Sequence, residues 1–327
     1  MSINRNEPSP VKQFIVSKTK VFIYKSAKDA GYAAAINVAL NQMDLFDKKG
    51  FVSIVLMAAP SAYEFYKSYI KISKTNKNMQ NAIKNTHYFQ MDDYPLPEDH
   101  PASFRYLLKT KFFNHLEKYI DKNKIHLLKA DSKNISRICV EYKNLILDYG
   151  QDIQIKGQGE DGHWGFYQPY NSFDGEPSII KVKLNKMNVS QQLRDHPNLY
   201  NSLDDPTKVA FTGNVPLFMR TKVLIEDIVP QRSKAFTLVA SYGNEEIDPI
   251  CPSGKIKEHP NSYARINMDS AWALIEYREK GYLSEDAIFN LDKIWETPGD
   301  RDATVYKKRF MRKAFKRLNI KYKDYKK

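Results

Sequence analysis

A glycine-rich segment in the middle of the chain carries the residues best suited to acid–base chemistry. It reads GQGEDGH over residues 157–163 and follows a short predicted strand at residues 152–155. Glycines on both sides of an acid and a histidine let the backbone approach a ligand closely. A histidine two residues from an aspartate can be oriented by that carboxylate and can act near neutral pH, so Asp161 and His163 are candidates for acid–base catalysis. A tight turn with an exposed histidine is the alternative interpretation.

A pair of acids follows another predicted strand. Asp92 and Asp93 come directly after the apolar run at residues 87–91. A carboxylate at a strand end can serve as a base that moves a proton between adjacent carbons. An acidic turn exposed to water is the commoner structure for such a pair when it is taken alone.

Two basic residues are candidates for holding a phosphate. Arg194 follows a stretch with little acid, and Lys234 immediately precedes the apolar run at residues 235–241. An arginine fork and a lysine are the usual phosphate ligands in proteins. Either residue alone is more often a hydrated surface charge.

Other classes of site are disfavoured. The glycine turn places an acid and a histidine where a dinucleotide-binding loop needs small residues, and no Walker A lysine motif is present. Cys139 and Cys251 belong to no CxxC or Cys/His cluster, which disfavours a disulfide scaffold and a structural zinc site. No apolar run approaches the ~20 residues that span a bilayer, and residues 1–13 do not resemble a secretory signal. We therefore expect a cytoplasmic protein without a membrane partner.

The elements that must position these residues alternate along the chain. Strands are predicted at residues 20–24, 51–57, 87–91, 152–155 and 235–241, and helices at residues 27–45, 63–72, 103–119, 217–225 and 270–280, the last two preceded by short runs at 208–212 and 264–268. Such alternation predicts an α/β fold with a doubly wound, mostly parallel sheet, Rossmann-like, with helices on both faces. Ligands bind such sheets at the carboxyl ends of the strands, where the candidate residues stand. We expect a polar leader (1–19), one α/β domain (20–290) and a basic C-terminal extension (291–327).

The net charge of +13 is concentrated in that extension. Residues 307–327 contribute +10, which leaves +3 for the preceding 306 residues. Apolar residues recur at helical spacing within 307–319, which predicts an amphipathic basic helix; they are Phe310, Met311, Ala314, Phe315 and Leu318. An anionic surface, nucleic acid or lipid, is one conceivable partner. We favour a helix that docks its apolar stripe on the body or on a neighbouring subunit, so nucleic-acid binding is expected to be weak and a homo-oligomer stays open.

Taken together and in order, four segments resemble the glucosamine-6-phosphate deaminase / 6-phosphogluconolactonase superfamily. They are FQMDDYPLPEDHPASF (89–104), GQGEDGHWGFYQP (157–169), RSKAFTLVAS (232–241) and SGKIKEHPNSYARINMDSAWAL (253–274). The resemblance covers roughly residues 20–280. The GxGxDGH motif placed after MDxY is fairly specific as a pair, and the Asp…His-Pro form of the first segment favours the deaminase branch.

The resemblance implies a role for each candidate. The residue matching Asp92 moves a proton between C2 and C1 of an amino sugar, and the residue matching His163 opens the sugar ring while Asp161 orients it. The positions matching Arg194 and Lys234 bind the phosphate of a small sugar phosphate, and no metal or organic cofactor is implied. The expected site residues are Asp92, Asp161, His163 and Gln168 for catalysis and Ser61, Asp93, Gly159, Arg194 and Lys234 for binding.

The chain departs from the family pattern at two places. Gln168 replaces the family's orienting glutamate; it can accept a hydrogen bond from imidazole but brings no charge to raise the histidine's pKa. The family's phosphate loop PTGGTP is replaced by residues 58–62 (AAPSA), where Ser61 is the only hydroxyl and Pro60 has no N–H. A lactone hydrolase of the same superfamily and a catalytically weak, sugar-phosphate-binding paralogue are the alternative functions.

Overall fold

An eight-stranded sheet forms the centre of the molecule. The computed structural model describes residues 7–296 and 300–325. The sheet order is β1-β2-β11-β10-β7-β3-β4-β6, with β1 antiparallel to β2 and the other neighbours parallel. Its strands are β1 (Lys12–Val16), β2 (Thr19–Tyr24), β3 (Val52–Leu56), β4 (Thr86–Gln90), β6 (Ile125–His126), β7 (Gln151–Lys156), β10 (Thr221–Val229) and β11 (Ser262–Asn267). A second, antiparallel sheet has the order β5-β9-β8, formed by Asp92–Asp93, Val209–Gly213 and Ile179–Lys183.

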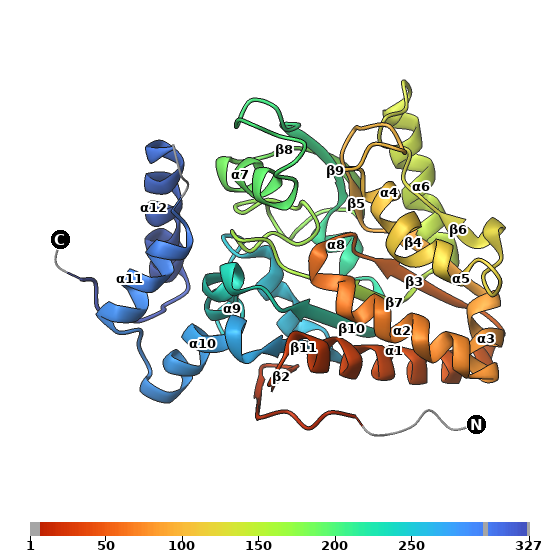
Figure 1. Cartoon of the computed structure of the whole chain (residues 1–327), viewed down its shortest axis with the longest axis horizontal. Helices are drawn as coiled ribbons and strands as arrows, with labels where there is room; N and C mark the ends of the chain where they lie inside the picture. Colours follow the sequence, from red (N-terminus) through yellow and green to blue (C-terminus); the bar gives the residue numbers. More distant parts are fainter. Residues whose placement is uncertain (1–6, 297–299, 326–327) are drawn as a thin grey trace.

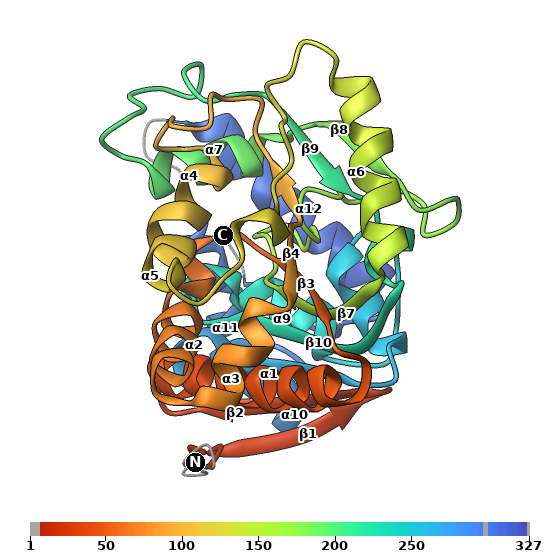
Figure 2. The same ribbon diagram turned by 90° about the vertical axis from the view of Figure 1, so that its right-hand side faces the viewer.

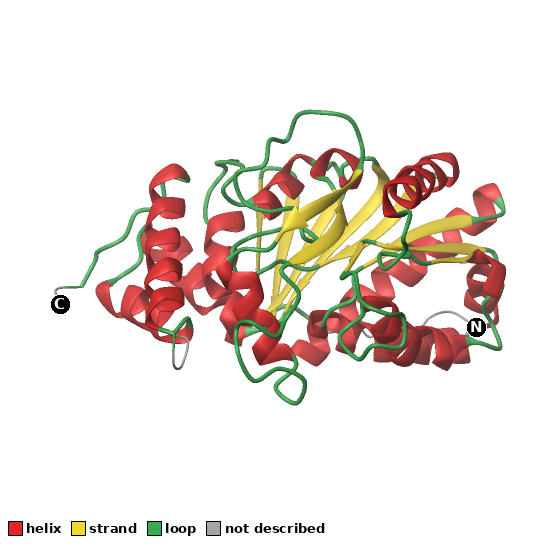
Figure 3. Ribbon diagram, turned by 90° about the horizontal axis from the view of Figure 1, so that it is seen from above, coloured by secondary structure: helices red, strands yellow, loops and turns green. Residues whose placement is uncertain are grey.

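Helices cover both faces of the large sheet, as expected (Figures 1 and 3). One face packs against α1 (Ala27–Lys49), α2 (Tyr63–Thr75) and α3 (Lys77–Lys84), and the other against α6 (Ile135–Tyr149), α9 (Ala235–Tyr242) and α10 (Met268–Lys280). Successive side chains of a strand point to opposite faces. In β3, Val55 therefore joins the hydrophobic cluster that contains α9, while Ile54 and Leu56 join the one that contains α2. This double burial explains why β3 reads as an unbroken apolar run.

Most predicted elements are present. Ser26 caps α1 by accepting a hydrogen bond from the Asp29 amide, and the helix predicted at 103–119 is observed as α4 (Phe104–Leu108), a π-helical turn (Lys109–Phe113) and α5 (Asn114–Leu116). Several elements had not been predicted, among them β1, β8, α6, α7 (Lys186–Asp195) and α11 (Glu285–Ile294). Strand β1 lies within the segment that was expected to be a polar leader. Figure 2 shows β1 at the edge of the molecule next to β2.

Two predicted elements have the wrong type. The strand predicted at residues 235–241 is helix α9, and the helix predicted at 217–225 is mostly strand β10, preceded by the short helix α8 (Val215–Phe218). All eight residues of α9 are buried, so no polar face reveals a helical period. Most of β10 is buried as well, in the middle of the sheet between β11 and β7. Fully buried elements lose the periodicity on which both predictions relied.

The C-terminal helix docks on the body as expected. It is α12 (Arg301–Arg317), and the expected apolar stripe is buried, with Phe310, Met311, Ala314 and Phe315 on the helix and Leu318 at its end. The Phe315 ring lies 5.3 Å from that of Phe236 on α9, and the Phe310 ring 6.0 Å from it. Figure 1 shows α12 at one end of the molecule, on the side of α9 and α10. In the described part of the chain, no helix combines the length and apolar character needed to cross a bilayer.

This packing predicts a large stability loss on truncation of Phe315. Phe315→Ala should lower the free energy of unfolding by about 3–5 kcal/mol, because the cavity between α12 and α9 cannot be refilled. Val305→Ala is the matched control, since Val305 lies on the same helix but is 37% exposed, and should change stability by less than about 0.5 kcal/mol. Urea denaturation of both variants measures the difference. Equal, small losses would show that α12 is not docked on α9 in solution.

Candidate active site

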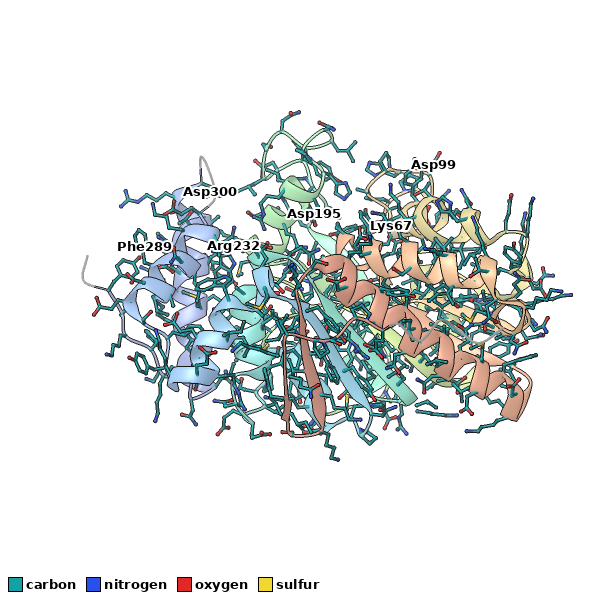
Figure 4. The ribbon with its side chains drawn as sticks, turned by 60° about the horizontal axis from the view of Figure 1, so that its bottom comes forward. Lys67, Asp99, Asp195, Arg232, Phe289 and Asp300 are labelled. Atoms are coloured by element: carbon teal, nitrogen blue, oxygen red, sulfur yellow. The ribbon has the colours of Figure 1, made fainter. Side chains whose placement is uncertain are left out.

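A pocket opens at the carboxyl-terminal edge of the large sheet. Residues that follow strands β3, β4, β7 and β10 line it, which is where open α/β sheets bind ligands. These residues are Met57 to Ser61, Met91 and Asp92, Gly157 to Glu160, and Gln231. The rest of the wall comes from His163, from α7 and from the turn just before α9. Helix α7 and the residue after it contribute Asn188, Gln191, Gln192, Asp195 and His196, and the turn contributes Ser233 and Lys234. Figure 4 shows Asp195 at the end of α7, on the same upper side of the molecule as Lys67 and Arg232.

A buried carboxylate holds the candidate catalytic histidine. His163 Nδ1 lies 2.6 Å from Asp161 Oδ1, and the His163 main-chain N–H donates to the same oxygen. The other carboxylate oxygen accepts hydrogen bonds from the side-chain amides of Asn185 and Asn188. Burial raises the pKa of Asp161, but His163 and Asn185 outweigh this effect and hold the pKa at about 2. The ionised carboxylate fixes the proton on Nδ1, and because no described residue hydrogen-bonds Nε2, that nitrogen can exchange a proton with a ligand.

The glycines of the turn are required by close approach. A Cβ at Gly159 would lie 2.0 Å from His163 Cε1, so the imidazole packs directly on the Gly159 backbone. Gly162 has a φ of +83°, and a Cβ there would also meet the Cys251 sulfur at 2.6 Å. Ser253 Oγ stabilises the turn by donating a hydrogen bond to the His163 carbonyl oxygen at 2.9 Å. Gly159 thus serves the site by making room for the imidazole.

The two adjacent aspartates have different environments. Asp92 lines the pocket and is almost fully buried, and burial, helped by the neighbouring charge of Asp93, raises the pKa of its carboxyl well above the usual value. Asp93 does not line the pocket: its carboxylate accepts hydrogen bonds from the Phe104 amide and Arg105 Nε, both at 2.8 Å, at the start of α4. Consecutive strand residues point to opposite faces, which accounts for the divergence. Asp93 was expected to bind substrate, but in the structure its carboxylate anchors the start of α4 instead.

The candidate phosphate ligands are only partly brought together. Lys234 and Ser61 line the pocket, and Ser61 Oγ donates to Gln231 Oε1 at 2.8 Å. Burial lowers the pKa of Lys234, while the carboxylate of Glu160 opposes this shift. Arg194, by contrast, does not line the pocket and forms an ion pair with Glu160.

Gln168 does not contact the imidazole in this structure. Its Oε1 accepts a hydrogen bond from Asn185 Nδ2 at 3.0 Å, and its Nε2 donates to the Phe166 carbonyl. The expected direct hydrogen bond to His163 is therefore wrong, because Asn185 stands between Gln168 and Asp161. Asn185 was missed from the sequence, although an asparagine that caps a helix, here α7 through the Met187 and Asn188 amides, is a recognisable signal.

A buried ion pair underlies the turn. Lys156, at the end of β7, lies 2.9 Å from the Asp227 carboxylate on β10, and both side chains are fully buried. Gln158, the second residue of the turn, donates to the same carboxylate at 2.6 Å, and Tyr242 also donates to it. Burial lowers the pKa of Lys156 and Asp227 opposes that shift. Within residues 7–296 and 300–325, no three His, Cys, Asp or Glu side chains are grouped so as to hold a metal ion.

The packing of His163 on Gly159 generates a direct test. Gly159→Ala should displace the imidazole, because the new methyl carbon would overlap its ring, and should remove the strongly downfield proton resonance expected for the 2.6 Å hydrogen bond to Asp161. Gly254→Ala is the control, since a Cβ there approaches its nearest neighbour only to 3.9 Å. Histidine-detected NMR on folded samples compares the two. A resonance that survives in Gly159→Ala would contradict this geometry.

Comparisons with known proteins point to one superfamily. No protein-family model matches the chain. It is 28% identical over 242 residues to a glucosamine-6-phosphate deaminase of Pseudoalteromonas translucida, covering 73% of this chain and 85% of that one, and 26% identical over 214 residues to that of Shouchella clausii, covering 65% and 81%.

Solved structures agree on the fold. A monomeric glucosamine-6-phosphate deaminase superposes with a TM-score of 0.66 at 22% identity, covering 77% of this chain and 98% of that one. The 6-phosphogluconolactonase of Trypanosoma brucei superposes with a TM-score of 0.60 at 12% identity, covering 79% and 98%. In sequence and in fold, the chain is therefore similar to proteins of the glucosamine-6-phosphate deaminase / 6-phosphogluconolactonase superfamily.

Proposed function

We propose that the protein is a hexosamine-6-phosphate isomerase/deaminase, which converts an amino-sugar phosphate to a ketose phosphate and releases ammonia. The observation that carries the proposal is that Asp92 and His163 line the same pocket. The names of the similar sequences, glucosamine-6-phosphate deaminases, support the same reaction class. The reaction needs two separate proton-transfer groups, and these two side chains come from different strand ends.

Ring opening is assigned to His163. The C1 hydroxyl loses a proton, the bond between C1 and the ring oxygen breaks, and the ring oxygen gains a proton. An imidazole whose Nδ1 is held by Asp161 can pass that proton through Nε2. The open-chain aldehyde then makes the hydrogen on C2 acidic.

Proton transfer between carbons is assigned to Asp92. Its carboxylate removes the proton from C2 and returns it to C1, while a proton from the substrate ammonium passes to the aldehyde oxygen, which becomes the C1 hydroxyl. The nitrogen on C2 is left as an iminium, which water hydrolyses to a ketone and ammonia. The free protein favours the protonated acid, since burial raises the pKa of Asp92. A bound substrate ammonium would favour the carboxylate. A lactone hydrolase would need His163 but not this shuttle, so the buried carboxyl at Asp92 favours the deaminase.

Replacing Asp92 should impair ammonia release while leaving substrate binding intact. Asp92→Asn should reduce ammonia release from D-glucosamine 6-phosphate by roughly 10²–10⁴-fold, because the amide cannot accept the C2 proton. Substrate binding should persist, and Asp99→Asn, an exposed acid of the following loop, is the control. Exchange of the C2 hydrogen with deuterated water gives a second readout. Unchanged exchange in Asp92→Asn, or wild-type turnover of 6-phosphogluconolactone alone, would refute the assignment.

The raised pKa of Asp92 predicts that the acidic side of the pH–rate profile lies at higher pH than for an ordinary aspartate. Because only the carboxylate is a base, kcat/KM should rise with pH, and its midpoint should lie above the value of about 4 usual for an aspartate. Measuring kcat/KM for the same substrate between pH 4 and 9 tests this. A limb centred near pH 4 would mean that the catalytic carboxyl is not the buried Asp92.

A further inference from the structure

One lysine of the basic C-terminal helix is buried against the site. Lys307 lies in the first half of α12, and its side chain is fully buried, whereas the other Lys and Arg residues of α12 are exposed or half-buried. Its Nζ donates a hydrogen bond to Ser190 Oγ on α7 at 3.1 Å. This contact joins residues 117 positions apart in the chain. A buried lysine on an otherwise hydrated basic helix needs a specific reason.

Ser190 connects Lys307 to the candidate phosphate ligands. Arg194 Nη1, one helical turn along α7, donates to the same Ser190 oxygen at 3.1 Å, and Arg194 forms an ion pair with Glu160. Burial raises the pKa of Glu160, but Lys234, Arg194 and Lys307 outweigh it and lower that pKa. Three cations thus act on one buried carboxylate, and Arg194 contacts it directly.

The cluster carries surplus positive charge at one end of the pocket. Arg194, Lys234 and Lys307 leave a charge of about +2 after Glu160 is counted, when all are ionised. Burial and the charge of Arg194 lower the pKa of Lys307 to about 8, so most of it is protonated at neutral pH. Other carboxylates offset part of this charge, since Asp195 and Asp161 act on Lys234 and Asp300 acts on Lys307. Asp195 is exposed, so water and salt screen its charge.

The helix that carries Lys307 is also fixed to Tyr170, which lies in the loop beyond the glycine-rich segment. Lys313 Nζ lies 4.7 Å over the ring of Tyr170, and the Phe310 ring lies 6.4 Å from it. Arg317 pairs with Asp248 at 2.9 Å. These contacts hold α12 against Tyr170 and Asp248, so the position of Lys307 is set by more than one hydrogen bond.

We propose that Lys307 is a positioning residue that, through Ser190, Arg194 and Glu160, makes this end of the pocket suited to a phosphate monoester. The loop at residues 58–62 offers few donors, with one hydroxyl at Ser61 and no N–H at Pro60. Lys307 of the C-terminal helix compensates by adding positive charge near Glu160, which lines the pocket. The inference rests on the proposed function only in taking the anion to be a sugar phosphate.

The test removes the charge of Lys307 while keeping its aliphatic stem. Lys307→Met should raise KM for D-glucosamine 6-phosphate by about tenfold or more, as expected for loss of a buried hydrogen bond and charge, and change kcat much less. Lys307→Arg should restore most of the affinity. Arg309→Met, an exposed position of the same helix, is the matched control.

Two further measurements separate this inference from the function itself. Inorganic phosphate binding, followed by calorimetry, should weaken in Lys307→Met by a similar factor even if no amino sugar is turned over. KM for unphosphorylated D-glucosamine should be unaffected, which a general loss of structure would not produce. A folded Lys307→Met protein, with unchanged melting temperature, that binds inorganic phosphate and the sugar phosphate as wild type does would overturn the proposal.

Discussion

The site depends on one buried carboxylate, that of Asp161. A fully buried charge is tolerated only when hydrogen bonds replace its hydration. His163, in the turn after β7, and Asn185 and Asn188, at the start of α7, supply the hydrogen bonds to the Asp161 carboxylate. The Asp161 side chain therefore fixes the imidazole and also holds α7, which forms a wall of the pocket. Because both contact the same carboxylate, the imidazole and α7 have a fixed position relative to each other.

Paired charges recur around this centre at different depths. Below the turn, Lys156 and Asp227 join neighbouring strands β7 and β10 in a fully buried pair. Beside the turn, Glu160 is held ionised by the cations near it. In the pocket itself, Asp92 is buried without a cation of this kind, and its pKa is raised. The contrast is chemically useful, because a compensated carboxylate orients its neighbours while an uncompensated one can take up a proton.

Local patterns predicted part of the scaffold. Helix α1 has Ser26 as a visible cap, and β3 is an apolar run of strand length. The predictions failed at α9 and β10, where nearly every side chain is buried and the pattern loses its period. Helix α7, which forms part of the pocket wall, was missed because its sequence is largely polar, although Asn185 caps it.

The sequence by itself determined which side chains meet at the pocket through strand ends. Alternating strands and helices bring the carboxyl ends of parallel strands to one edge, so Asp92 and His163 had to converge there. Only the tertiary structure decided the direction of Asp93, the separation of Gln168 from His163 and the burial of Lys307 against α7. Those outcomes depend on strand pleat, on one intervening asparagine and on packing between distant segments, and the contacts that set them join residues 12, 17 and 117 positions apart in the chain.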